Sequence, residues 1–135
     1  MRHLGIDFGT KKVGLALSDE AGSMGFPHGI LPNDGRLIDE ILALIERKGV
    51  EKVIMGESRD YQGNENAVAK DAKAFARLIE SRSRIEVDFE PEILTTQEAR
   101  RDPEGVRMTG HAPVDASAAA LILTSYLSRT HDRRD

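Results

Sequence analysis

The sequence contains no cysteine and no tryptophan, and only two tyrosines and four phenylalanines. Without cysteine, disulfides and thiolate zinc sites are excluded, and nothing points to an oxidising compartment. So few aromatic residues argue against a platform on which bases of a single strand stack. No apolar run approaches the roughly 20 residues that cross a bilayer, and the first residues lack the apolar segment of a signal peptide. We therefore expect a cytoplasmic protein with no membrane association.

What the sequence does contain is typical of one folded domain. It has 135 residues, of which 39% are hydrophobic, and this argues against disorder. The net charge is -4, from 19 basic and 23 acidic residues. Such a balance neither requires nor forbids a nucleic-acid partner, because cations can gather on one face. We expect a single domain over residues 1–135, with residues 129–135 as a charged, frayed tail.

The hydrophobic pattern predicts a mixed α/β fold. Strands are expected over 3–8, 13–18, 24–31, 50–55 and 85–89, and helices over 34–49, 65–81 and 115–128. Pro27 should place the third strand at a sheet edge or in a bulge. Polar loops are expected over 56–63 and 102–113, and a short capped helix should start near 95–98. This β-β-β-α-β-α-β-α order predicts a five-stranded mixed sheet with helices on both faces, as in RNase H-like domains.

Asp7 is the most informative residue, because aspartate is disfavoured inside strands and this one lies in the first. Ile6 and Phe8 should point into the core, whereas Gly5 and Gly9 should leave open space beside the carboxylate. A carboxylate on a rigid strand suits a hard divalent cation. The alternative is an Asx hydrogen bond that caps the following turn.

Three further carboxylates are expected near the same edge of the sheet. Glu57 follows the fourth strand, Glu92 follows the fifth, and Asp115 begins the last helix. Each has an ordinary explanation: solvation for the two glutamates and helix capping for Asp115. Together with Asp7 they would form a like-charged cluster, which is costly unless a cation neutralises it. Two metal ions at such a cluster could activate water and stabilise the leaving oxygen of a phosphodiester.

Three motifs resemble the YqgF/RuvX family of Holliday junction resolvases and pre-16S ribosomal RNA nucleases. They are GIDFGTKKVGLA over 5–16, LTTQEA over 94–99 and VDASAAALIL over 114–123, and they occur in the family's order. The resemblance implies an RNase H-like nuclease that depends on Mg²⁺ or Mn²⁺ and acts on structured RNA or branched DNA. By position, it implies that Asp7, Glu92 and Asp115 are the catalytic metal ligands.

Two departures from the family pattern affect this interpretation. Where the family has Asp-Glu-Arg before Leu-Thr-Thr, this chain has Pro91, Glu92 and Ile93, so an arginine suited to phosphate is replaced by an apolar residue. After the fourth strand, the family's Gly-Leu-Pro is replaced by Gly56, Glu57 and Ser58. Related resolvases carry a metal-binding glutamate near this place, so Glu57 is a further catalytic candidate that would supplement or replace Glu92.

Basic residues near the motifs are candidates for phosphate contacts, which would make binding sensitive to salt. The alternative for each of them is a solvated surface cation. These substrate-binding candidates are Lys11, Lys12, Arg100, Arg101, Arg107 and His111.

Two other functions compete with a metal-dependent endonuclease. A catalytically impaired nucleic-acid-binding or scaffold domain is favoured by the altered motif around Glu92. The Asp-Phe-Gly-Thr hairpin also resembles the phosphate loop of sugar kinases and actin-like ATPases, but those enzymes need two domains around the nucleotide. The sequence leaves monomer and homodimer open: a two-fold symmetric junction favours a dimer, and trimming one RNA end does not.

Overall fold

The computed structural model describes residues 1–57, 67–91 and 116–134. The elements there follow the predicted order. They are β1 (Arg2–Phe8), β2 (Lys12–Ser18), β3 (Gly25–Pro32), α1 (Leu37–Lys48), β4 (Val50–Glu57), α2 (Ala67–Ser83), β5 (Val87–Pro91) and α4 (Ala116–Arg134). The predicted short helix near 95–98 and the loop over 102–113 lie outside the described residues.

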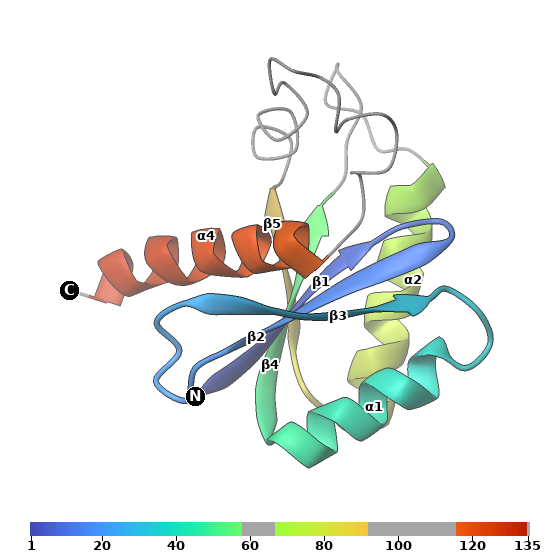
Figure 1. Ribbon diagram of the computed structural model, residues 1–135, viewed down its shortest axis with the longest axis horizontal. Coiled ribbons are helices and arrows are strands. Elements are labelled where there is room, and N and C mark those ends of the chain that lie inside the picture. The colour runs from blue at the N-terminus through green and yellow to red at the C-terminus, as the bar shows by residue number, and fades with distance from the viewer. Residues whose placement is uncertain (58–66, 92–115, 135) are drawn as a thin grey trace.

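The strands form one five-stranded sheet in the order β3-β2-β1-β4-β5. β1 runs parallel to β4, and β4 runs parallel to β5, whereas β2 is antiparallel to both β1 and β3. The carboxyl ends of β1, β4 and β5 therefore reach the same edge of the sheet (Figure 1). The predicted mixed sheet is confirmed.

One face of the sheet is covered by α1 and α2, and the other by α4 (Figure 1). The α1/α2 face holds the larger apolar core, because the strands alternate and send every second side chain to it. Ile6, Ile41 and Ile79 are fully buried there, and Phe8 packs against the same cluster. Ile6 and Phe8 thus point into the core, as the sequence predicts.

The α4 face is built from smaller residues. Its buried cluster is Ala16, Ile54, Ala119, Ala120, Ile122, Leu123, Tyr126 and Leu127. A Cβ atom added to Gly5 or Gly25 would lie 2.9 Å from the Cβ atom of Leu123. The helix therefore rests directly on the backbones of β1 and β3, and only glycine permits so close an approach.

Two local predictions about the element ends are confirmed. β3 is an edge strand, and its register with β2 shifts between Leu15 and Ala16, beside Pro27. Pro27 is tolerated there because an edge strand need not donate every ladder hydrogen bond. α1 ends at Gly49, whose φ of 65° is the left-handed conformation that glycine adopts without a steric penalty.

Several element boundaries differ from the predictions, and three of the differences have a clear structural reason. β4 continues through Gly56 and Glu57, which were expected in a loop, because these residues pair with Glu90 and Pro91 of β5. β5 starts at Val87 rather than at Ile85, since the left-handed Arg84 (φ 65°) turns the chain just before it. α4 runs to Arg134, so the expected end at Ser128 is wrong.

Among the described residues, no helix is both long and apolar enough to cross a membrane.

Candidate active site

Asp7 lies one residue before the end of β1, at the edge where the parallel strands finish, and its residue is only 5% exposed. It faces the α4 side of the sheet, because its neighbours Ile6 and Phe8 occupy the other side. A rigid central strand thus holds a buried carboxylate at the edge where α/β folds commonly place their sites.

The space around Asp7 differs from the prediction. Gly5 does not leave room beside the carboxylate, because α4 fills that place: the Cβ position of Gly5 lies 3.0 Å from the carbonyl oxygen of Ala119. The neighbouring positions across the sheet are also glycines. Gly14 pairs with Asp7 on β2, and Gly56 follows Met55, the β4 partner of Ile6. Neither adjacent strand therefore places a side chain beside the carboxylate.

Glu57 lies at the same edge but on the other face. Ile54 belongs to the buried cluster under α4, and Met55 belongs to the core under α1 and α2. Strand alternation therefore assigns Gly56 to the face of Asp7 and Glu57 to the α1/α2 face. Glu57 is half-buried there.

Six of the predicted site residues lie outside the described residues: Glu92, Arg100, Arg101, Arg107, His111 and Asp115. The elements next to two of them are described. Pro91 ends β5 beside Glu57 of β4, so Glu92 follows a strand that finishes at the edge of Asp7. Ala116 begins α4, whose first turns cross β1 at Gly5, so Asp115 precedes a helix that starts near the end of β1 (Figure 1).

The donor chemistry at Asp7 fits a hard divalent cation. A buried carboxylate is costly unless a cation or hydrogen bonds compensate it, and carboxylate oxygens are the ligands that Mg²⁺ and Mn²⁺ prefer. Among the side chains that the structure describes, in residues 1–57, 67–91 and 116–130, no three histidine or acidic groups gather as a metal site would require. Any site of three or more such ligands would therefore include side chains outside these ranges.

Lys11 and Lys12 lie at the turn between β1 and β2, and both are exposed. Asn33 braces this turn: its backbone N–H donates to the carbonyl of Lys11 at 2.9 Å, and its side-chain amide donates to the carbonyl of Gly9 at 2.7 Å. Sequence reasoning missed Asn33, and its one signal is its position directly after the strand that pairs with β2. The turn thus presents two exposed cations on a fixed backbone, at the edge of the sheet where β1 ends.

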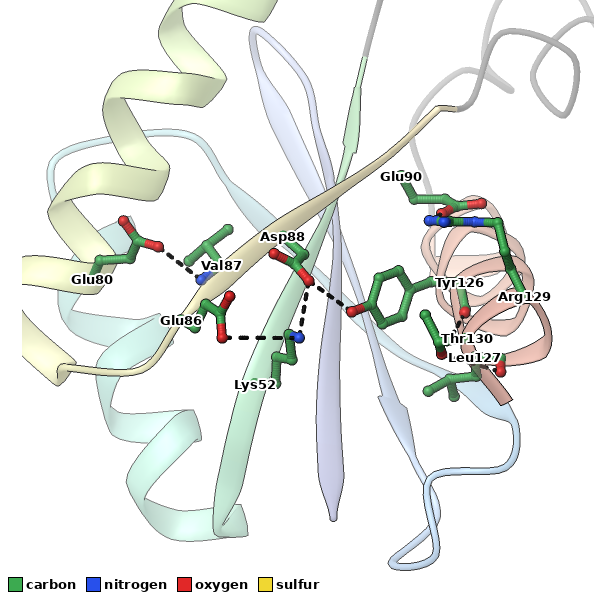
Figure 2. Close-up of polar contacts among 10 residues, drawn as sticks. All are labelled: Lys52, Glu80, Glu86, Val87, Asp88, Glu90, Tyr126, Leu127, Arg129 and Thr130. Atoms are coloured by element: carbon green, nitrogen blue, oxygen red, sulfur yellow. Dashed lines mark hydrogen bonds and ion pairs between the residues drawn. The ribbon is translucent and has the colours of Figure 1, made fainter. Parts of the chain in front are cut away.

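A polar cluster that the sequence did not suggest joins β5 to α4 (Figure 2). Asp88 accepts a hydrogen bond from the Tyr126 hydroxyl at 2.7 Å and pairs with Nζ of Lys52 at 2.9 Å. Glu90, 4% exposed, accepts hydrogen bonds from Ser125 and Arg129. The available signal was the alternation of Asp88 and Glu90 on one strand face.

The pKa shifts of Asp88, Lys52 and Arg129 favour the charged forms of these three residues. Burial raises the pKa of Asp88, but the hydrogen bonds from Tyr126 and Lys52 together lower it further, to below its ordinary value. Burial likewise lowers the pKa of Lys52, and its contacts with Tyr126 and Asp88 outweigh this and raise it. The hydrogen bond to Glu90 raises the pKa of Arg129. Asp88, Lys52 and Arg129 are therefore charged at neutral pH, and the two cations each pair with a carboxylate of β5.

Comparison with known proteins assigns the family. The model of a family described as RuvX, Holliday junction resolvase, matches residues 1–129. The chain belongs to the RuvX family. A relative from Nitratidesulfovibrio vulgaris (strain DSM 19637 / Miyazaki F) is 32% identical over 139 residues, covering 99% of this chain and 98% of the relative. Another, from Shouchella clausii, is 32% identical over 136 residues and covers 96% of both chains. Both are named as candidate pre-16S rRNA nucleases.

Solved structures support the RNase H-like fold of this RuvX-family chain. RuvC of T. thermophilus in complex with a Holliday junction substrate superposes with a TM-score of 0.63 at 19% identity, over 97% of this chain and 96% of RuvC. The fowlpox virus Holliday junction resolvase gives a TM-score of 0.53 at 13% identity, over 96% of this chain and 99% of that one. At these identities the likeness shows the fold alone.

Proposed function

We propose that this chain is a metal-dependent endonuclease that hydrolyses phosphodiester bonds in structured nucleic acid. Its first expected substrate is the 5′ end of pre-16S ribosomal RNA, and its second is a four-way DNA junction. The observation that carries the proposal is the buried Asp7, held at the common carboxyl edge of β1, β4 and β5 with glycines on both adjacent strands. Family membership and the names of the relatives support the reaction class.

In this proposal Asp7, Glu92 and Asp115 hold Mg²⁺ or Mn²⁺. A metal bound there supplies electrostatic stabilisation of the charge that develops on the phosphodiester. The bare backbone at Gly14 and Gly56 lets a phosphate approach Asp7 closely. Lys11 and Lys12 bind flanking phosphates from the braced turn, as can Arg100, Arg101, Arg107 and His111, and binding therefore weakens as salt rises.

Glu92 is a better candidate than Glu57 for a metal ligand beside Asp7. Alternation along β4 assigns Glu57 to the face opposite Asp7, whereas Glu92 comes two residues after Glu90, which lies on the α4 face. A strand that continued its alternation would turn Glu92 toward the face of Asp7. We therefore expect Glu92, and not Glu57, to complete the metal site.

The test is a titration of Mg²⁺ and Mn²⁺ with a short structured RNA and a four-way DNA junction as substrates. Asp7→Asn and Glu92→Gln should each reduce metal-dependent cleavage by more than about 100-fold, because even groups behind the ligands commonly contribute about 10- to 100-fold. Glu57→Gln is the matched control and should remain within about two-fold of the wild type, since its carboxylate lies on the other face.

A second measurement separates metal binding from catalysis. A metal that binds only the folded state raises its stability, so Mn²⁺ should raise the Tm of the wild type but not that of Asp7→Asn. Metal binding without cleavage of either substrate would contradict the nuclease and favour a nucleic-acid-binding role, which the altered Pro91, Glu92 and Ile93 also suggest. Light scattering during turnover distinguishes monomer from homodimer, and a dimer would favour the junction substrate.

A further inference from the structure

The side chain of Glu90 is held at both of its oxygens by α4. Ser125 Oγ donates to Oε2 at 2.8 Å, and Arg129 donates to Oε1. Ser125 and Arg129 are one helical turn apart and therefore lie on the same face of α4. Glu90 is nine-tenths or more buried, so the pair fixes both the position and the rotation of the helix against β5. We call Glu90, Ser125 and Arg129 the β5–α4 clamp.

The clamp lies on the two elements that lead to the expected metal ligands. β5 ends at Pro91, one residue after Glu90, and continues directly into Glu92. α4 begins at Ala116, directly after Asp115. A connection between β5 and α4 therefore holds the ends of the two elements from which the chain continues to Glu92 and to Asp115. The Glu90 carboxylate itself is occupied by Ser125 and Arg129.

The helix has a second fixed point, at which Leu123 rests on the backbones of Gly5 and Gly25. Along the helix axis, Arg129 lies about 9 Å from Leu123 on one side and Ala116 lies about 10 Å from it on the other. Between these two points α4 is also held by the Gly25 N–H, which donates to Thr124 Oγ1 at 3.0 Å, and by the Tyr126 hydroxyl, which donates to Asp88. Loss of the Arg129 pair leaves the helix to tilt about these inner contacts, and such a tilt moves its first residue, Ala116, as well.

The clamp also neutralises the negative charge of Glu90. Glu90 pairs with Gly56 in register, and Gly56 lies next to Asp7 on the same face of the sheet. Without Arg129, this buried carboxylate would face the neighbourhood of Asp7 uncompensated and compete for a cation. Because Arg129 neutralises Glu90, a cation is drawn to Asp7 and not to Glu90.

We propose that the β5–α4 clamp positions Asp115 and Glu92 around the metal that Asp7 binds. Glu90, Ser125 and Arg129 are positioning residues in this account, because they touch neither substrate nor metal. The inference rests on the proposed nuclease function. The neighbouring hydrogen bond from Tyr126 to Asp88 holds the same two elements together further from the edge, and Lys52 of β4 pairs with Asp88 there (Figure 2).

The activity test uses Arg129→Met, with Arg129→Lys as the conservative variant and assays well below the Tm of each protein. We expect Arg129→Met to lower kcat by roughly 10- to 100-fold and to raise the half-saturating Mn²⁺ concentration, with an unchanged KM for nucleic acid. Arg129→Lys should restore part of the loss. Arg82→Met is the matched control, because it breaks an arginine–carboxylate pair with Asp39 on the other face.

A distance measurement tests the clamp without using activity. The chain has no cysteine, so Ser117→Cys on α4 and Glu46→Cys on α1 provide unique sites for spin labels, and both positions are exposed. With the labels in place, Arg129→Met should broaden the distance distribution between the two helices, and Arg82→Met should leave it unchanged. Broadening would be the direct sign that α4 swings at its first turn.

The outcomes separate the two proposals. If the wild type cuts nucleic acid but Arg129→Met changes neither kcat, metal dependence nor the distance distribution, the clamp has no positioning role and the inference is overturned. If the wild type cuts neither substrate, the nuclease function fails, and the distance distribution alone decides whether the clamp holds α4. A loss of activity that tracks only the folded fraction would also contradict positioning.

Discussion

The two faces of the sheet are covered in different ways. Under α1 and α2, bulky side chains such as Ile6, Ile41 and Ile79 fill the volume between the layers. Under α4, the helix rests on the bare backbone of Gly5 and Gly25 and is tied to β5 by paired charges. Apolar packing depends mainly on volume, whereas backbone contact and charge pairing require one relative position. The α1/α2 face therefore supplies stability, and the α4 face supplies the precision that a site needs.

The largest expected effect comes from emptying the α1/α2 core. Ile41→Ala should lower the free energy of unfolding by about 2–5 kcal/mol, because it removes a fully buried side chain and leaves a cavity. Denaturation in urea measures this loss, and the half-buried Ile38→Ala should lose less. At temperatures where the variant is folded, kcat should match the wild type. If the kcat of Ile41→Ala falls along with its stability, both faces of the sheet position the site.

An intermediate effect is expected where α4 contacts β1. In Gly5→Ala the new methyl group would lie 2.9 Å from Leu123 Cβ and 3.0 Å from the Ala119 carbonyl, so the helix must shift. Overpacking of this kind costs about 1–3 kcal/mol. We expect kcat to fall together with stability, because the shift displaces the start of α4. The control is Gly29→Ala, whose Cβ would meet no atom within 4 Å. Equal kcat in the two variants would contradict the division between the faces.

The smallest expected effect concerns pH. His3 lies on the α4 side, beside the ring of Tyr126, and burial lowers its pKa below the ordinary value of 6.5. The unfolded chain therefore binds a proton more readily than the folded one, and stability should fall slightly as the pH drops below 6.5. The Tm of the wild type should decrease more between pH 7 and pH 5 than that of His3→Gln. Identical decreases would mean that His3 is not the acid-sensitive group.

The sequence was a good guide to the parts of the fold that depend on local pattern. The order of the elements, the edge strand at Pro27 and the core positions of Ile6 and Phe8 follow from periodicity and backbone preference. Asp7 could also be singled out, since aspartate inside a strand is locally unfavourable. The motifs then indicated the family, which the family model confirms.

Positions that depend on partners distant in the sequence could not be predicted. The space expected beside Gly5 is filled by α4, which lies more than a hundred residues further along the chain. Glu57 was expected in a loop near Asp7, but pairing with Pro91 extends β4 and assigns Glu57 to the opposite face. The helix was expected to end at Ser128, but it continues through Arg129, which pairs with Glu90 on β5. The sequence pattern does not show this pairing.

The sequence by itself determined the candidates for chemistry: a strand aspartate, a pair of cations in the next turn, and the motifs of a nuclease family. It did so because composition, periodicity and turn preference are local properties of the chain. Only the tertiary structure decided which carboxylates share a face with Asp7 and how α4 is held against β5. These depend on strand register and on close backbone contact, and both exist only after distant segments have packed together.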